Sequence, residues 1–174
     1  MNYQNQIKKY EVINTKRLEL MPLSLEQLKL MRKSIKQLEL ELNVTYKGEA
    51  LEGFILEYLD HQIRIITETP QSCMYTAFWL ITRKSDRVVV GSASFKGMPD
   101  EKGEIEIGYG LAKEFEHNGY MAEAVGKMCE WGLSQVGVKH IIAETDVDGY
   151  GSQRVLERNG FSRYGFGESS WYRL

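Results

Sequence analysis

The chain has 174 residues, of which 22 are Lys or Arg and 24 are Asp or Glu, so its formal net charge is −2. This length suits one compact domain, and we expect a single domain over residues 1–174, with a flexible segment at 1–14 and a core over about 15–165. Hydrophobic residues make up 43 % and charged residues 26 %, which excludes an intrinsically disordered chain. The balanced charge excludes a general nucleic-acid binder, because such a protein needs a basic face.

The cysteines, histidines and N-terminal residues indicate the cellular setting. Cys73 and Cys129 lie far apart, and the three histidines offer no zinc spacing, so we expect neither a disulfide framework nor a metal site. The first ten residues lack the apolar stretch of a secretory signal, and no run of about 18 apolar residues occurs. We therefore expect a cytoplasmic protein with no membrane or nucleic-acid partner.

The first part of the chain predicts a strand followed by helices. Alternation at period two predicts a strand at residues 17–21, and Ser24 with Gln27 has the capping-box spacing that starts a helix. Residues 51–66 carry apolar side chains at helical spacing and predict a second amphipathic helix, or a helix pair. The apolar stripe of the first helix consists of Leu25, Leu28, Met31, Ile35 and Leu38.

The rest of the chain predicts a sheet whose later strands alternate with helices. Residues 75–82 and 87–95 predict two strands of a hairpin with its turn at 83–86, and residues 104–111 a third antiparallel strand. A helix at 120–135, a strand at 140–145, a helix at 152–158 and a strand at 161–164 follow. This alternation favours crossover helices, so we expect an α/β (α+β) fold with a mixed sheet covered by helices.

Gly119 stands between a predicted strand and an amphipathic helix. The first turn of a helix leaves N–H groups unpaired at the positive end of the helix dipole, and glycine lets a phosphate approach without a Cβ in the way. An anion such as a pyrophosphate could bind there, although a plain turn or helix cap explains the same glycine. The choice depends on the rest of the sequence.

A second stretch, at residues 143–161, provides that context. Together the two stretches resemble the GNAT superfamily of N-acetyltransferases, and within it the branch of ribosomal-protein alanine N-acetyltransferases. The likeness covers roughly residues 15–164 and includes residues 15–18 near the N-terminus. The residues that match in type and spacing are Glu106, Ile107, Gly108, Tyr109, Gly119, Tyr120, Glu123, Ala124, Ser152, Arg154, Val155, Leu156, Glu157, Gly160 and Phe161.

The resemblance implies a centrally splayed sheet, acetyl-CoA as co-substrate and transfer of its acetyl group to a primary amine. The amine would belong to a protein N-terminus or to a small molecule, and the likeness is compatible with a homodimer. Residues 115–122 would surround the pyrophosphate, and backbone N–H groups near Leu111 would polarise the thioester carbonyl. The implied coenzyme-binding residues are Leu111, Glu116, His117, Asn118, Gly119, Tyr120, Met121, Ala122 and Ser152.

Three residues depart from the pattern of the family. Glu116 stands where Gln or Arg is usual, Met121 where Gly or Ala is usual, and Gly149 where Asn is usual. A carboxylate near a pyrophosphate is unfavourable by about 1 kcal/mol at 4 Å in water, unless it points outward. A catalytically degenerate acyl-CoA-binding module that acts as a sensor or scaffold is therefore the alternative function.

Glu106 and Ser152 are the candidate catalytic residues. Glu106 could take the proton of the amine through a water, although with Glu104 it also fits an alternating, solvated sheet face. Ser152 could protonate the leaving thiolate or bind the coenzyme, and it also fits the N-cap of a helix at 153–158. Many superfamily members have a Tyr acid where this chain has Leu156, which leaves Ser152, Tyr150 or solvent for that role.

Other candidates have simpler explanations. His117 could be a base, but a lone histidine in a polar loop is usually solvated, and Cys129 fits the apolar face of a helix. We expect the two N-terminal helices and residues 169–174 to determine acceptor specificity, with Trp171 as a residue that could border the acceptor pocket. If Glu104 and Glu106 face an open cleft, a cationic acceptor is favoured.

Overall fold

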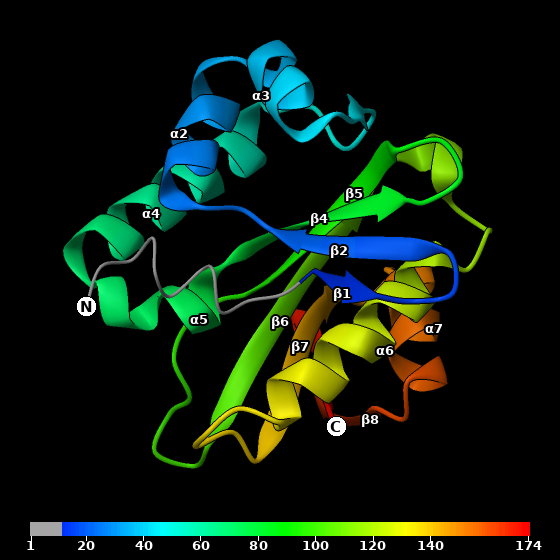
Figure 1. Ribbon diagram of the computed structural model, residues 1–174. Coiled ribbons are helices and arrows are strands. Elements are labelled where there is room, and N and C mark those ends of the chain that lie inside the picture. The colour runs from blue at the N-terminus through cyan, green and yellow to red at the C-terminus, as the bar shows by residue number, and fades with distance from the viewer. Residues whose placement is uncertain (1–11) are drawn as a thin grey trace.

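The computed structural model describes residues 12–174 (Figure 1). These residues form a nine-stranded sheet in the order β1-β2-β4-β5-β6-β7-β9-β8, with β3 paired to β5 outside this sequence of neighbours. Within it, β6 pairs with β7 in parallel, as β3 does with β5, and the other pairs are antiparallel. The strands are β1 (Ile13–Asn14), β2 (Leu18–Pro22), β3 (Thr45–Tyr46), β4 (Phe78–Arg83), β5 (Val88–Phe95), β6 (Glu104–Leu111), β7 (His140–Asp146), β8 (Ser162–Phe166) and β9 (Ser169–Arg173).

Helices cover both faces of this sheet (Figure 1). On one face lie α2 (Leu25–Lys33), α3 (Ile35–Leu42) and α4 (Gly53–Glu68), and on the other lie α6 (Tyr120–Leu133) and α7 (Tyr150–Arg158). Short helical turns, η1 (Pro70–Ser72), α5 (Cys73–Thr76) and η2 (Lys113–Phe115), connect the longer elements. The predicted α/β class with a mixed, helix-covered sheet is confirmed.

The sheet separates two hydrophobic cores. The larger core lies between the sheet and helices α6 and α7, and the smaller one lies under α2, α3 and α4. Buried members of the larger core include Trp79, Phe95, Ile105, Ile107, Val125, Met128, Ile141, Leu156 and Tyr172. Buried members of the smaller core include Leu23, Leu28, Met31, Leu38, Leu59, Ile66, Phe78, Leu80 and Val89.

The predicted first helix is two helices. Ser24 caps α2 through the expected capping box with Gln27, but Ser34 has an extended backbone that ends α2 and begins α3. The Ser34 N–H donates to the Leu30 carbonyl, while its side chain accepts from the Gln37 N–H. The predicted apolar stripe still faces the core, because the two helices turn the same side toward the sheet.

Three further expectations about local structure need correction. Tyr75 lies in the turn α5 and not in a strand, and its hydroxyl donates to the Val136 carbonyl at 2.6 Å. Ile13 and Asn14, expected in a flexible segment, pair with β2, whereas residues 1–11 of that segment lie outside the described residues. The core extends past residue 165, because β9 pairs with both β7 and β8 and buries Tyr172.

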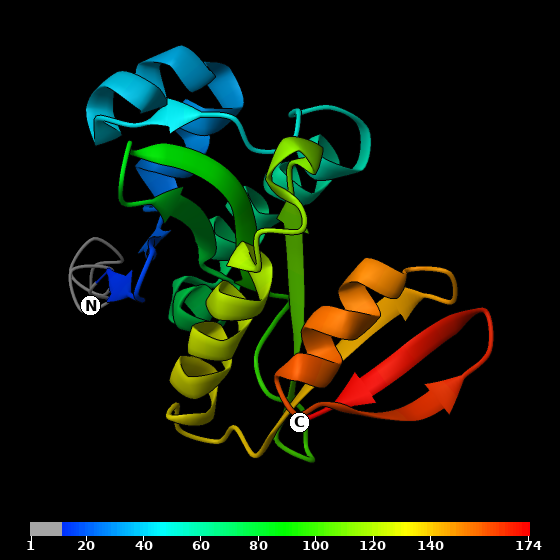
Figure 2. The ribbon, with the colours of Figure 1, turned by 90° about the vertical axis from the view of Figure 1, so that its right-hand side faces the viewer.

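The sheet parts between β6 and β7, as Figure 2 shows. The two strands pair only where Glu104–Glu106 lie beside His140–Ile142. Beyond that point β6 continues to Leu111 beside β5 alone, while β7 turns away with β9. The predicted central splay is therefore present.

The splay leaves particular backbone groups of β6 facing the gap. Lys96 N–H donates to the Glu106 carbonyl at 2.8 Å, and Ala112 N–H donates to the Val90 carbonyl at 3.0 Å. Because successive residues of a strand direct these groups to opposite sides, the N–H groups of Tyr109 and Leu111 point toward the side that β7 has left. They are therefore available for a ligand in the gap.

A substitution at Leu156 measures how much the packing of α7 stabilises the divided sheet. Leu156 is 0 % exposed, so Leu156→Ala leaves a cavity and should cost about 2–5 kcal/mol of unfolding free energy. Leu40→Ala, the same change at a helical residue that is 76 % exposed, should cost less than about 0.5 kcal/mol. Urea unfolding of both variants measures the difference, and equal losses would contradict the described packing.

Candidate active site

A cavity of about 390 Å³ lies between the end of β6, the first turn of α6 and the side of α7. Most of the residues that the sequence assigns to the coenzyme line it. The lining consists of Tyr109, Gly110, Leu111, Glu116, His117, Gly119, Tyr120, Met121, Ala122, Gly151, Ser152, Arg154, Val155 and Arg158. We call it the coenzyme cavity.

The loop before α6 presents the N-terminus of that helix to the cavity. Gly119 is the N-cap and has a φ of 74°, in the left-handed region that glycine adopts at little cost. The first helical hydrogen bond runs from Glu123 N–H to the Gly119 carbonyl, so the N–H groups of Tyr120, Met121 and Ala122 have no acceptor within the helix. This end of α6 therefore suits an anion.

An ion pair from the turn before β2 holds this helix end in place. Arg17 donates to Glu123 Oε2 at 2.7 Å through its Nε and to Glu123 Oε1 at 2.8 Å through its backbone N–H, and it also reaches the Asn118 carbonyl. Burial raises the pKa of Glu123, but the hydrogen bonds from Thr15 and Arg17 outweigh it and lower that pKa overall. These contacts explain why residues 15–18 belong to the same sequence pattern as the helix.

Two of the predicted coenzyme residues take a different part from the one expected. Asn118 does not line the cavity, because its side-chain amide turns back to donate to the carbonyls of Phe115 and Glu116. Met121 lines the cavity, but the residue is only 5 % exposed and packs in the larger core, so its size leaves the cavity open. Glu116 lines the cavity, but its side chain remains 49 % exposed to solvent.

Arg154 and Arg158 bring positive charge to the coenzyme cavity, which the predictions from sequence missed. They lie four residues apart on α7 and therefore on one face of that helix. Within residues 12–174 neither guanidinium has an ion-pair partner. Their positive charges offset the negative charge of Glu116. Their spacing of four residues in a predicted helix could have indicated that both face the same cavity.

A second cavity, of about 530 Å³, opens between α4 and the sheet, and we call it the acceptor cleft. It shares Tyr109, Gly110 and Ser152 with the coenzyme cavity, so the two meet at the splayed end of β6. The remaining lining residues are Glu49, Phe54, Ile55, Tyr58, Phe78, Ser92, Ala93, Ser94, Lys96, Ile107, Gly108, Glu144, Thr145, Asp146 and Ser169.

Ser152 lies at this junction, but it is not a helix cap. α7 begins at Tyr150 with Gly149 as its N-cap, because the chain becomes helical earlier than predicted. Ser152 Oγ lies 2.8 Å from the hydroxyl of Tyr109, which also donates to the Ser152 carbonyl at 3.3 Å. Burial raises the pKa of Tyr109 to about 12, so its hydroxyl keeps its proton at neutral pH. The sequence alone assigned no role to this tyrosine side chain.

The two glutamates of β6 are ion-paired and do not themselves line the acceptor cleft. Glu106 pairs with Lys96, which does line it, and Glu104 Oε1 lies 2.6 Å from Arg173 Nη2. The catalytic role of Glu106 stays a prediction. The expectation that these two carboxylates attract a cationic acceptor is not supported, because each already has a basic partner.

The remaining candidates lie away from the junction. Cys129 is buried, which raises the pKa of its thiol to about 12, and Trp79 packs edge-on against Trp131 with ring centroids 5.3 Å apart. The His117 side chain is 93 % exposed at the mouth of the coenzyme cavity. Trp171 is partly buried on β9 and does not line the acceptor cleft, although Ser169 of the same strand does.

Residues 12–174 contain neither a metal centre nor a membrane-spanning helix. No group of three metal-ligating side chains gathers in these residues. Every helix of this described part is too short or too polar to cross a bilayer.

Comparison with known proteins identifies the family. Residues 17–162 match the model of the acetyltransferase (GNAT) domain, so the chain belongs to the GNAT acetyltransferase family. It is also 32 % identical over 150 residues to the uncharacterized N-acetyltransferase YjdG of Bacillus subtilis (strain 168), covering 86 % of this chain and 89 % of that one. The protein is an N-acetyltransferase whose co-substrate is acetyl-CoA, and the resemblance seen in the sequence is confirmed.

Solved structures show the same fold. The ribosomal-protein-S5-alanine acetyltransferase of Vibrio fischeri has a TM-score of 0.69 at 13 % identity, over 95 % of this chain and 96 % of that one. A ribosomal L7/L12 alpha-N-protein acetyltransferase in complex with coenzyme A has a TM-score of 0.67 at 16 % identity, over 94 % of this chain and 97 % of that one. The overall fold is therefore shared with enzymes of the ribosomal-protein branch.

We predict that the two arginines of α7 contribute to coenzyme affinity through their charge. Arg154→Gln should weaken acetyl-CoA binding about fivefold. In water, two unit charges about 4 Å apart attract each other by about 1 kcal/mol, and the variant loses this attraction to a phosphate. Arg32→Gln, which breaks a surface pair with Asp60 on α4, should leave the affinity unchanged. Calorimetry at low and high salt measures both, and an equal affinity of Arg154→Gln and the unchanged protein at low salt would disprove the assignment.

Proposed function

We propose that this enzyme acetylates a primary amine that enters through the acceptor cleft while acetyl-CoA occupies the coenzyme cavity. The observation that carries the proposal is the meeting of the two cavities at Tyr109, Gly110 and Ser152. At that point β6 is paired with β5 on one side, and on the other side its backbone faces the gap and has no partner strand. A thioester held there would be open to an amine from the opposite side.

The coenzyme half of the proposal rests on the N-terminus of α6 and the arginines of α7. The N–H groups of residues 120–122 and the helix dipole suit a pyrophosphate, and Arg154 with Arg158 adds two positive charges. Their attraction for a pyrophosphate exceeds the repulsion from the single carboxylate of Glu116, which is half exposed to solvent. The departures from the family pattern at residues 116 and 121 therefore leave a usable anion site.

The backbone of β6 provides the polarising group for the thioester. The N–H of Leu111 points into the gap and would donate to the carbonyl oxygen as it gains negative charge. The neutral amine nitrogen then forms a bond to the carbonyl carbon, the bond from carbon to sulfur breaks, and sulfur leaves as a thiolate. In this proposal the Tyr109–Ser152 hydroxyl pair, at 2.8 Å, gives the thiolate a proton. The nitrogen, positively charged after the attack, then loses one of its two protons, which restores the hydroxyl pair.

The shape of the acceptor cleft supports a primary amine with an apolar neighbouring group. Phe54 is an exposed aromatic residue of α4 that stacks with Tyr58 at 6.2 Å between ring centroids, and both line the cleft. Such a surface accepts the N-terminus of a protein, as named for the ribosomal-protein enzymes of similar fold, or a small amine. We also propose a cytoplasmic location, where such acceptors and acetyl-CoA occur together, and a homodimer, which size-exclusion chromatography would detect.

Calorimetry with acetyl-CoA followed by a thiol-release assay tests the proposed function. Binding together with release of free thiol in the presence of a panel of amines supports it. Binding without turnover against any amine would identify a coenzyme-binding sensor or scaffold instead. No binding at millimolar acetyl-CoA would disprove both functions.

Glu106 remains our predicted proton acceptor for the amine, acting through water. An alkylamine with a pKa near 10 is about 0.1 % neutral at pH 7, so Glu106→Gln should lower kcat/KM about 10²- to 10⁴-fold there. The loss should shrink as pH rises, because solvent then removes the proton. Glu104→Gln is the matched control on the same strand, since its partner Arg173 does not line the cleft, whereas Lys96, the partner of Glu106, does. Full activity of Glu106→Gln at pH 7 would contradict the assignment.

The Tyr109–Ser152 pair gives a separate prediction. Ser152→Ala and Tyr109→Phe should each lower kcat by about 10², the lower end of general acid catalysis, because each breaks the 2.8 Å hydrogen bond between the hydroxyls. The double variant should be no slower than the slower single variant, since the two groups act as a unit. If the loss of kcat in the double variant equals the product of the two single losses, the two hydroxyls act independently.

A further inference from the structure

The carboxylate of Glu49 lies where the acceptor cleft meets the coenzyme cavity. It comes from the loop between β3 and α4, and it lines the cleft beside Gly110, which lines both cavities. A Cβ atom placed on Gly110 would lie 1.7 Å from Glu49 Oε2. The carboxylate therefore rests against the backbone of β6 between Tyr109 and Leu111, whose N–H groups face the gap.

The backbone around Glu49 is anchored to the sheet. β3 pairs in parallel with β5, and Lys47 N–H extends this pairing by donating to the Val89 carbonyl at 3.0 Å. The hydroxyl of Tyr46 donates to the backbone carbonyl of Glu49 at 2.9 Å. These contacts hold the residue over Gly110 without using its carboxylate.

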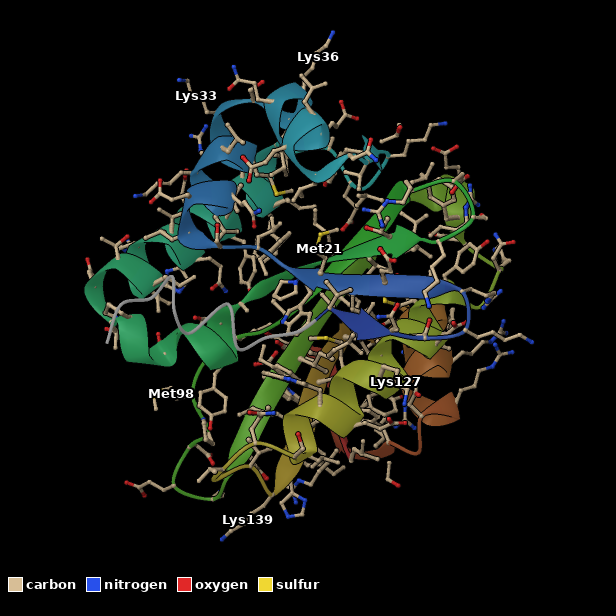
Figure 3. All side chains as sticks on the ribbon, viewed as in Figure 1. Met21, Lys33, Lys36, Met98, Lys127 and Lys139 are labelled. Carbon is tan, nitrogen blue, oxygen red and sulfur yellow. The ribbon has the colours of Figure 1, made fainter. Side chains whose placement is uncertain are left out.

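The Glu49 carboxylate has no partner within residues 12–174. Lys47, two residues earlier, reaches toward Glu114 at 3.9 Å, and Lys96 of the cleft is paired with Glu106. Lys33 and Lys36 project outward from the α2 and α3 end of the molecule, and Lys139 projects outward at the opposite end (Figure 3). Burial raises the pKa of the Glu49 carboxyl, because its charged form loses hydration without gaining a counter-ion. A cation in the cleft would supply the missing counter-ion.

We propose that Glu49 binds the ammonium group of the acceptor and so makes the enzyme selective for cationic primary amines. The inference rests on the proposed function and names the acceptor class of the same cleft. The ammonium would form a charge-assisted hydrogen bond with Glu49, while the apolar part of the acceptor packs on Phe54 and Tyr58. Three carboxylates line this cleft, those of Glu49, Glu144 and Asp146, and Glu49 is the one that lies against Gly110, where the two cavities meet. Selection by charge at the reaction point then comes from Glu49 and not from the ion-paired Glu104 and Glu106.

The bound ammonium must lose one proton before it reacts. That proton passes to water in the cleft and onward to Glu106, the predicted proton acceptor. The freed electron pair of nitrogen forms the bond to the carbonyl carbon, and the electron pair of the broken bond to sulfur leaves with the thiolate. The thiolate takes one proton from the Tyr109–Ser152 hydroxyl pair, and the second proton lost by the nitrogen restores that pair. Glu49 thus acts on binding of the acceptor, whereas Glu106 acts on the rate of its deprotonation.

Glu49→Gln keeps the size of the side chain and removes its charge, so it separates these roles. For an alkylamine that is cationic at pH 7, KM should rise about tenfold while kcat changes less than about twofold. For an arylamine that is neutral at pH 7, KM should stay within about twofold. Glu52→Gln, at an exposed position of the same loop, should change neither value. Acetyl-CoA affinity, measured by calorimetry, should be unchanged in both variants and shows that they fold.

Two results would overturn the inference while the proposed function stands. One is an alkylamine KM that Glu49→Gln leaves unchanged, and the other is an equal rise in KM for the alkylamine and the arylamine. If the unsubstituted enzyme releases no thiol with any amine, the proposed function fails, and this inference fails with it. The unsubstituted enzyme therefore reports on the proposed function, and the comparison of amines reports on Glu49.

Discussion

The parting of β6 from β7 is the constraint on which the whole site depends. Three residue pairs join the two strands. Beyond these pairs the strands form no backbone hydrogen bonds with each other, which costs roughly 1 kcal/mol for each bond not formed. The larger core offsets this cost, because residues of α6 and α7 pack against both halves of the divided sheet. Packing of the larger core thus keeps the strands apart and orients the backbone donors of β6 toward the gap.

Ion pairs surround the proposed site, while charged residues inside its two cavities lack such partners within residues 12–174. Around the site, Arg17 with Glu123, Lys96 with Glu106 and Arg173 with Glu104 form pairs that fix strands and helices relative to one another. The two cavities hold charges that form no ion pair within residues 12–174, with Arg154 and Arg158 on one side of the junction and Glu49, Glu144 and Asp146 on the other. In the proposed function, positive charge thus faces the coenzyme and negative charge faces the acceptor.

The sequence predicts those features that depend on nearby residues. The bounds of β6, the capping box at Ser24 and the start of α6 after Gly119 follow from alternation, capping and glycine placement, and all three are confirmed. The break at Ser34 was missed although it is local, because a serine cap interrupts an apolar stripe that continues through both helices. The position of Tyr75 was missed because its contact with Val136 is distant in the sequence. Glu49 could not be predicted, since its place over Gly110 depends on the pairing of β3 with β5 and of β5 with β6.

The division of the interior into two cores has a consequence for substitutions in either core. Helices α2, α3 and α4 pack on one face of the sheet, and α6 and α7 pack on the other. Residues in separate cores exchange little energy, so changes in one are nearly additive with changes in the other. A substitution in the α4 wall that alters the proposed acceptor cleft should therefore leave the packing around α6 and α7 nearly unchanged.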